Sequence, residues 1–260
     1  MGIAGPSAPT QTSGAQPGSS TSDPAERLIV ALDFPSADLA LNLVDRLEGT
    51  CRWFKVGMEL YYAAGNSVID RLRDRGFEVF LDLKLHDIPN TVAGAVRSVA
   101  GVGASLLTIH AGGGEKMMQA AAKAARIPSA PKLLAVTVLT SMDAAELAGV
   151  GVTTGSVEDQ VLRLARLAGS AGIDGLVCSP QEVEAVRRAM GPGTLLVVPG
   201  IRAVGSAGTD DQARVASAAE TIARGASMLV VGRPITQALD PSKAAAGILA
   251  EIRRAIETGN

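Results

Sequence analysis

The segment Glu78–Lys84, with the sequence EVFLDLK, indicates a buried strand that ends in charged residues. Apolar side chains dominate it, but Asp82 and Lys84 interrupt the run. Because side chains alternate between the two faces of a strand, Asp82 and Lys84 share one face and the intervening leucines take the other. A charge inside a strand is costly unless it has a partner. We therefore expect this strand to present an acid and a base to one space at its carboxyl end.

Short apolar runs rich in β-branched residues recur along the chain, and amphipathic segments separate them. Their starts are roughly 20 to 40 residues apart, enough for one strand, one helix and two loops. The eight predicted strands are Leu28–Asp33, Arg52–Gly57, Glu78–Lys84, Ser105–His110, Leu133–Thr140, Ile173–Ser179, Leu195–Gly200 and Ser227–Gly232. Apolar residues at helical spacing predict helices that include Ala37–Glu48, Val68–Arg75, Thr91–Ala100 and Gln181–Met190.

Near-continuous apolar strands are typical of a parallel sheet that is buried on both faces. Eight β/α units in a domain of this length predict an α/β protein with a single (β/α)8 TIM barrel over residues 25–260. The alternative is an open doubly wound sheet. It is disfavoured because Asp33-Phe34-Pro35, and no Gly-x-Gly-x-x-Gly, follows the first strand. Polar residues also end many of the strands, whereas an open sheet gathers them at one switch point.

Residues 1–24 differ from the rest in composition. They are rich in Pro, Gly, Ser, Thr and Gln, and the first charged side chain is Asp23. Such a segment buries too little apolar surface to offset its ordering entropy. We expect a disordered tail, with no apolar stretch of the kind that a signal peptide needs.

The overall composition narrows the class of partner. The chain has 24 basic and 26 acidic side chains among 260 residues, which gives no electrostatic reason to expect nucleic acid or an anionic membrane. No apolar run is long enough to span a membrane. The two cysteines, Cys51 and Cys178, cannot form a multi-cysteine metal site, and we expect both to be reduced in a cytoplasmic protein.

The active site of a barrel enzyme lies at the carboxyl ends of its strands. A structural ion pair at the rim would explain one acid and one lysine, but two lysines and up to three acids on adjacent strands favour catalysis. A lysine held between carboxylates stays protonated, which suits a proton donor or an electrostatic stabiliser better than a Schiff-base nucleophile. The polar residues at the predicted ends are Asp33, Lys55, Asp82, Lys84, His110, Thr140, Ser179, Arg202, Gly232 and Arg233, and Asp87 follows at the entry to a helix.

The last two strands end in a similar way, with Gly200-Ile201-Arg202 and Gly232-Arg233. Loops at these two positions of the barrel commonly hold a phosphate group. Glycine lets backbone N–H groups approach the oxygens, and arginine offers a bidentate fork. A pair of surface arginines is the alternative. His110 precedes a glycine loop that could approach a ligand, but a structural histidine is at least as well supported, and we assign no role to His86.

The run Asp82–Thr91, with the sequence DLKLHDIPNT, resembles the characteristic motif of the orotidine 5′-phosphate decarboxylase family. The Asp-x-Lys-x-x-Asp core alone occurs in related groups as well. The similarity extends from Leu28 to Ile252, and the ordered set of segments makes it specific. Those segments are Ala31–Asp33, Lys55–Gly57, Val136–Ser141, Pro199–Arg202 and Val231–Pro234.

The resemblance implies decarboxylation of orotidine 5′-phosphate to uridine 5′-monophosphate in pyrimidine biosynthesis, with no cofactor and no metal. Lys84 would protonate C6 of the pyrimidine, and Asp82 would lie near the departing carboxylate. The implied catalytic network is Lys55, Asp82, Lys84 and Asp87. The implied substrate contacts are Asp33, Lys55 and Thr91 to the ribose, Thr140 to the pyrimidine, and Arg202, Gln212, Gly232 and Arg233 to the phosphate.

The family resemblance also implies a homodimer in which Asp87 and Thr91 enter the partner's site. The nearest rival is the metal-dependent sugar-phosphate group, which shares the Asp-x-Lys-x-x-Asp core. Those enzymes place a glutamate for Mg²⁺ where this chain has Lys55, which would repel a cation. A rival of another class is a non-catalytic barrel that binds a phosphorylated ligand. It would need the phosphate arginine but not four opposed charges.

Overall fold

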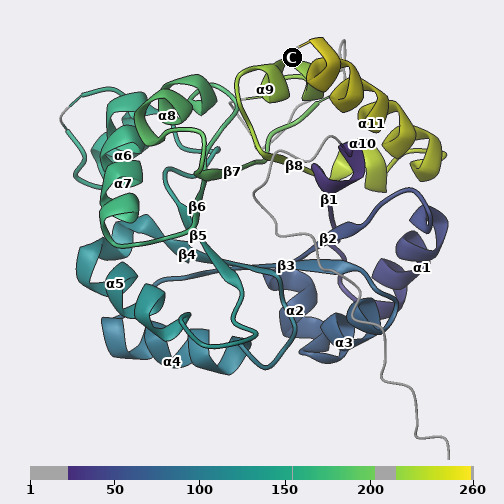
Figure 1. Cartoon of the computed structure of the whole chain (residues 1–260), viewed down its shortest axis with the longest axis horizontal. Coiled ribbons are helices and arrows are strands. Elements are labelled where there is room, and N and C mark those ends of the chain that lie inside the picture. Colours follow the sequence, from purple (N-terminus) through teal and green to yellow (C-terminus); the bar gives the residue numbers. More distant parts are fainter. Residues whose placement is uncertain (1–22, 154, 203–214, 259–260) are drawn as a thin grey trace, which may run out of the picture.

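The computed structural model describes residues 23–153, 155–202 and 215–258. Within these ranges eight parallel strands close into a barrel in sequence order, with β1 paired to both β2 and β8 (Figure 1). The strands are β1 (Leu28–Ala31), β2 (Trp53–Gly57), β3 (Glu78–Leu85), β4 (Leu106–His110), β5 (Lys132–Val136), β6 (Gly175–Val177), β7 (Leu195–Val198) and β8 (Met228–Val231). The predicted (β/α)8 barrel is confirmed, and most of its strands are shorter than the sequence suggested.

Helices surround the barrel and form its outer layer (Figure 1). Those over the predicted segments are α1 (Ala37–Leu47), α3 (Ser67–Asp74), α4 (Pro89–Val99) and α8 (Val183–Met190). The others are α2 (Met58–Ala64), α5 (Gly114–Ala124), α6 (Ala144–Gly149), α7 (Val157–Ser170), α9 (Ala218–Ala223), α10 (Arg233–Thr236) and α11 (Pro241–Thr258), with 3₁₀ turns η1 (Pro24–Glu26) and η2 (Ala111–Gly113). None of the helices in the described ranges combines the length and the hydropathy that a membrane crossing requires.

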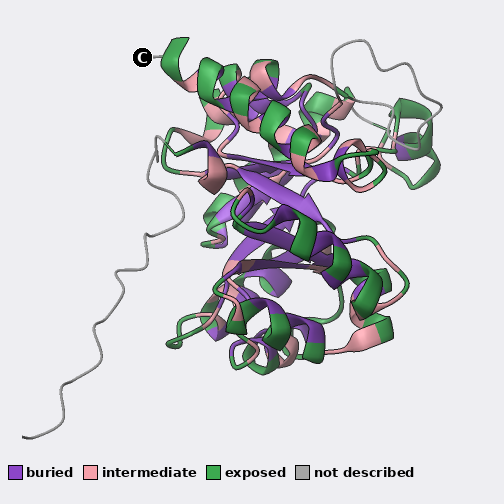
Figure 2. Ribbon diagram, turned by 90° about the vertical axis from the view of Figure 1, so that its right-hand side faces the viewer, coloured by how far each residue is buried: buried purple, intermediate pink, exposed green. Residues whose placement is uncertain are grey.

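Alternation along the strands divides the core into two layers, and Figure 2 shows the buried strands between more exposed helices. Leu107 and Ile109 of β4 face the helices, whereas Leu106 faces the barrel interior. The interior layer consists of Ile29, Ala31, Trp53, Phe80, Leu106, Leu134, Leu195, Val197, Met228 and Val230. This apolar layer fills the barrel, so the polar strand ends above it form the floor and walls of a pocket.

The predicted tail, residues 1–24, lies outside the described residues except for Asp23 and Pro24. Asp23 accepts a hydrogen bond from the N–H of Ala25 at 2.9 Å, and Pro24 is buried. Close by, Glu26 accepts a hydrogen bond from the indole N–H of Trp53 at 2.9 Å. This contact joins η1 to the interior layer at the amino ends of the strands.

Candidate active site

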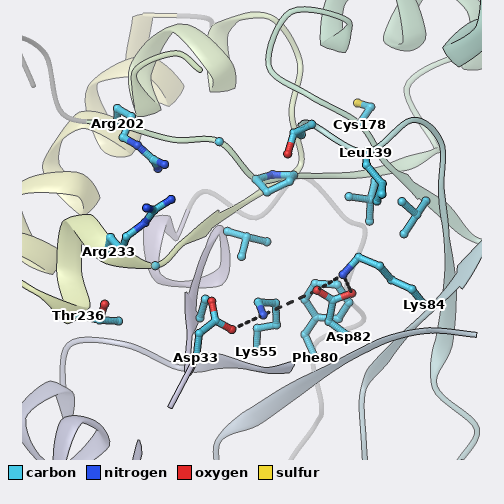
Figure 3. A pocket seen from close by; sticks show the side chains of 18 of the residues that line it. Asp33, Lys55, Phe80, Asp82, Lys84, Leu139, Cys178, Arg202, Arg233 and Thr236 are labelled. Carbon is cyan, nitrogen blue, oxygen red and sulfur yellow. Dashed lines mark hydrogen bonds and ion pairs between the residues drawn. The ribbon is translucent and has the colours of Figure 1, made fainter. Parts of the chain in front are cut away.

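A cavity of about 440 Å³ opens at the carboxyl ends of the strands (Figure 3). Its walls come from strands on opposite sides of the barrel, which brings together residues more than 200 positions apart in the chain. The described residues that line it are Ala31, Asp33, Lys55, Phe80, Asp82, Lys84, Val136, Val138, Leu139, Thr140, Val177, Cys178, Pro199, Gly200, Arg202, Val230, Gly232, Arg233, Thr236 and Gln237. Most of the predicted site residues are therefore neighbours in space.

Four charged side chains form an alternating row along one wall of this cavity (Figure 3). Lys55 Nζ lies 2.8 Å from Asp33 Oδ1 and 3.7 Å from Asp82 Oδ2. Lys84 Nζ lies 2.9 Å from each carboxylate oxygen of Asp82. The Lys55 and Asp82 side chains are only 10% and 13% exposed. Such pairing offsets part of the cost of removing these charges from water.

Asp82 remains ionised because its partners outweigh its burial. Burial raises the pKa of this carboxyl group, but the ammonium groups of Lys55 and Lys84 lower it. Hydrogen bonds from Lys84 and from the hydroxyl of Thr108 lower it further, and the net pKa lies below its ordinary value. The site therefore holds a negative charge beside Lys84 at neutral pH.

Gly57, at the end of β2, provides the space that Lys55 needs. A Cβ atom at this position would stand 2.8 Å from Lys55 Nζ and 3.1 Å from Asp33 Oδ1. Any larger residue would push against the two charged groups that form the first ion pair of the row. The glycine therefore leaves room for this ion pair, and a side chain here would force Lys55 Nζ to shift.

Strand β3 is irregular where it carries Asp82 and Lys84. Leu81 pairs with Leu107, but the next paired residue of β3 is Leu85, which pairs with Ile109. Lys84 adopts a left-handed backbone conformation with φ of 50°. The predicted alternation nevertheless holds, because Leu81, Leu83 and Leu85 pack against the outer core whereas Asp82 and Lys84 line the cavity. The register shift between β3 and β4 thus falls in the stretch that carries these two side chains.

Thr108 on β4 is a residue of this region that we did not predict. Its hydroxyl accepts a hydrogen bond from the backbone N–H of Lys84 at 2.8 Å and donates one to Asp82 Oδ1 at 2.9 Å. The side chain is fully buried behind the cavity. The sequence held one signal for it, because Thr108 is the polar residue within the apolar run Leu106–Ile109.

The two arginines lie beside one another in the cavity. Figure 3 shows the guanidinium groups of Arg202 and Arg233 directed into the space that also holds the charge row. The Arg202 side chain donates to the backbone oxygen of Ile201 at 2.7 Å, and its backbone N–H donates to Ala216 at 3.0 Å. Arg233 begins α10 directly after Gly232. Two cations at one end of a pocket suit a dianionic group such as phosphate. Gln212, predicted to help there, lies outside the described residues.

Asp87 and Thr91 lie apart from the other predicted residues. Both are exposed, and neither is among the described residues that line the cavity of their own chain. Between them Ile88 leaves 67% of its surface exposed. Their predicted contribution to the site of a partner subunit therefore stays a prediction.

The side chains of His86, His110 and Ser179 contact other groups of the protein. His86 and His110 stack with ring centroids 5.1 Å apart, and His110 Nδ1 accepts a hydrogen bond from the Gly112 N–H at 3.1 Å. Burial, followed by the charges of His86 and Lys84, lowers the pKa of His110. The hydroxyl and the N–H of Ser179 both bond to the buried carboxylate of Glu182. These contacts favour the structural interpretation of His110.

Comparison with known proteins identifies the family. The family model described as "Orotidine 5'-phosphate decarboxylase / HUMPS family" matches residues 26–248. The chain belongs to this family. The resemblance inferred from the motifs is thereby confirmed.

Individual members of the family are similar over nearly their whole length. Proteins named orotidine 5′-phosphate decarboxylase from Halorhodospira halophila and Nitrosococcus oceani are 51% and 53% identical to this chain, over 88% and 87% of it and 97% of each relative. A crystal structure of orotidine 5′-phosphate decarboxylase from Lactobacillus acidophilus superposes with a TM-score of 0.77 at 38% identity. It covers 87% of this chain and 98% of that one. The residues that line the cavity, from Ala31 to Gln237, all lie within the segment that the family model matches.

Proposed function

We infer that this chain decarboxylates orotidine 5′-phosphate to uridine 5′-monophosphate and CO₂, the reaction for which its relatives are named. The observation that carries the inference is the row Asp33, Lys55, Asp82 and Lys84 along one wall of the cavity. Four opposed charges held in a pocket are more than a phosphate-binding module needs. Lys55 also occupies the place between two carboxylates where a divalent cation would otherwise be attracted.

The chemistry of the reaction explains why such a row is useful. When the bond between C6 and the carboxylate breaks, CO₂ leaves and the electron pair stays on C6, where no adjacent π system delocalises it. The developing negative charge must therefore be stabilised electrostatically. The Lys84 ammonium supplies that stabilisation and then transfers a proton to C6. Asp82 holds Lys84 in place and lies near the departing carboxylate.

The remaining residues bind the nucleotide. Asp33 and Lys55 hold the ribose hydroxyls, and Thr140 recognises the edge of the pyrimidine. Arg202, Gly232 and Arg233, together with Gln212, bind the phosphate. The phosphate is remote from the bond that breaks, but its binding energy can be used to organise the site around the pyrimidine. The cavity of about 440 Å³ is within the usual range for a small-molecule site.

The active form is a homodimer in which Asp87 and Thr91 complete the site of the partner. Their exposure and the exposed Ile88 between them support this arrangement. The catalytic domain comprises residues 25–260. A cytoplasmic location fits an enzyme of nucleotide synthesis whose two cysteines, Cys51 and Cys178, are buried.

An ultraviolet assay of orotidine 5′-phosphate decarboxylation tests the function directly. The purified chain is expected to consume the nucleotide with loss of its characteristic absorbance, and to leave 3-keto-gulonate 6-phosphate unchanged. Turnover of the sugar phosphate instead would assign the chain to the metal-dependent group. Tight binding of the nucleotide without turnover would assign it to the non-catalytic class.

A further inference from the structure

The bulge in β3 leaves one residue of β4 facing three residues. Leu81 and Leu85 pair with Leu107 and Ile109, so Asp82, Leu83 and Lys84 all lie opposite Thr108. The regular ladder cannot satisfy the backbone groups of this stretch, because two of its three residues have no counterpart on β4. Thr108 keeps its own regular pairing on the other side, to Leu134 of β5. Thr108 is therefore held in a regular ladder with β5 while it faces the irregular stretch of β3.

The hydroxyl of Thr108 takes the place of the missing ladder contact. It accepts a hydrogen bond from the Lys84 backbone N–H at 2.8 Å, and it donates its own proton to Asp82 Oδ1 at 2.9 Å. One oxygen atom thus contacts the backbone of the proton donor and the carboxylate that holds the donor's ammonium group. It does so from a fully buried position, and it is not among the described residues that line the cavity.

The backbone of Lys84 needs such an anchor. A lysine with φ of 50° is in a conformation that side chains with a Cβ rarely adopt, and it persists only where surrounding contacts hold it. Without the hydroxyl, a partly buried N–H would lose its acceptor, and Lys84 could relax toward an ordinary strand conformation. That relaxation would move Nζ away from the position defined by its 2.9 Å contacts to Asp82.

We propose that Thr108 is a positioning residue for the decarboxylation, which sets the place of Lys84 Nζ and Asp82 through a single hydroxyl group without touching the substrate. The inference rests on the function proposed above. It predicts that the hydroxyl acts on the chemical step and hardly on substrate binding, because none of the predicted ribose or phosphate contacts involves Thr108.

Kinetics of Thr108→Val and Thr108→Ser test the proposal, since valine keeps the shape and serine keeps the hydroxyl. A displacement of about 1 Å at a catalytic group costs on the order of 100-fold, so kcat of Thr108→Val is expected to fall by about 10- to 100-fold with KM changed by less than about 3-fold. Thr108→Ser is expected to keep kcat within about 3-fold of the wild type. A kcat for Thr108→Val within about 2-fold of the wild type, or equal losses in both variants, would overturn the proposal.

Thr221→Val is the matched control. Thr221 is also fully buried, and its hydroxyl donates one hydrogen bond to the backbone oxygen of Ser217 at 2.7 Å, on α9 outside the barrel. This variant should lower the midpoint of thermal unfolding without changing kcat. If Thr108→Val does not fold, Thr108→Ser and Thr108→Ala replace it, because these two differ in the hydroxyl alone. A ratio of their kcat values near one would contradict the proposal.

Crystal structures of the wild type and of Thr108→Ala separate this inference from the proposed function. In the alanine variant the Lys84 backbone should leave the left-handed region and the contacts of Nζ to Asp82 should lengthen. An unchanged Lys84 would overturn the positioning role even if the wild type is fully active. Conversely, a wild type without turnover would defeat the proposed function, and the geometry of Lys84 in the two structures would still decide the positioning role.

Discussion

Lys84 Nζ lies 2.9 Å from both carboxylate oxygens of Asp82, at the edge of a cavity that opens at the carboxyl ends of the strands. The proposed proton donor is thus held by a symmetric contact to a carboxylate that is itself largely buried. Since Lys84 still leaves 30% of its side chain exposed, its ammonium group can reach a ligand in the cavity.

Replacement of Lys84 by alanine should abolish measurable turnover. The loss of an oriented general acid that also stabilises developing charge costs at least about 10²–10⁴-fold in rate. Steady-state assays with circular dichroism as a check on folding measure the effect. Lys123→Ala, which removes an exposed lysine from α5, should leave kcat unchanged. If Lys84→Ala retained more than about a tenth of kcat, another group would have to be the proton donor.

The stability difference between the wild type and Asp82→Asn should depend on pH. The folded-state pKa of Asp82 is depressed, so its charge stabilises the fold fully above the unfolded value of about 3.9 and the contribution is lost as pH falls through the folded pKa. Near pH 7 the variant should be less stable by about 3 kcal/mol, because two ammonium groups lose their partner. The gap should begin to close only as the pH falls below about 4, and the two curves should meet below the folded pKa of Asp82.

Denaturant unfolding measures these curves through the fluorescence of Trp53, the single tryptophan of the chain, which is buried in the barrel. Asp38→Asn is the control, since Asp38 is exposed and its ion pair to Arg71 spans 3.5 Å. Surface pairs contribute little, so its curve should follow that of the wild type at every pH. A constant gap for Asp82→Asn from neutral to acidic pH would show that its charge contributes nothing to stability.

Arg233→Ala should weaken binding of the phosphorylated substrate. The lost charge-assisted hydrogen bonds correspond to about 2–5 kcal/mol, which appears as an increase of KM. Orotidine without the phosphate should be nearly indifferent to the same change. Arg253→Ala on α11 removes an exposed arginine and serves as the control. Equal losses with both substrates would exclude Arg233 as the phosphate anchor.

Exhaustive chelation should leave the activity intact. Lys55 Nζ lies 2.8 Å from Asp33 and 3.7 Å from Asp82, so the space between these carboxylates already holds a cation. The assay compares the protein before and after dialysis against a chelator, with and without added Mg²⁺. Loss of turnover that Mg²⁺ restores would favour the metal-dependent sugar-phosphate chemistry.

Mixed dimers should recover activity from two inactive variants. Lys84→Ala and Asp87→Ala homodimers are each expected to be inactive, but a heterodimer has one site with both lesions and one with neither. Random pairing makes half of the dimers mixed, so about one quarter of the wild-type activity should return.

Differently tagged subunits show whether the exchange has occurred. If Asp87 served its own chain, every site in the mixture would carry one lesion and no activity would return. A purified heterodimer without activity would therefore contradict the assignment of Asp87 to the partner's site.

The regular part of the barrel was predictable because its signals are local. Each strand is a short apolar run, and the residues at its end follow directly in the sequence, so Lys55 and Arg233 could be assigned to the mouth from position alone. The short helix α2 was not predicted, since it begins directly after β2 without a loop to mark it.

The bulge in β3 and the contacts of Thr108 with Lys84 and Asp82 could not be read from the sequence. Both depend on the register between β3 and β4, which is a property of two strands rather than of one. Likewise Gly57 is one of 29 glycines, and only the distance to Lys55 Nζ distinguishes it.

The pairing of β1 with β8 has a consequence for how the protein is made. Of the eight strands, β1 is synthesised first. One of its edges stays unpaired until β8 is made, because Leu28 pairs with Leu229, about 200 residues later in the chain. At about 5–20 residues per second this takes roughly 10–40 seconds. During that time a nascent strand with open backbone groups is a template for aggregation. Because Asp33 follows β1 and Arg233 follows β8, the same late event assembles the cavity, and the growing chain gains its ligand site in one final step.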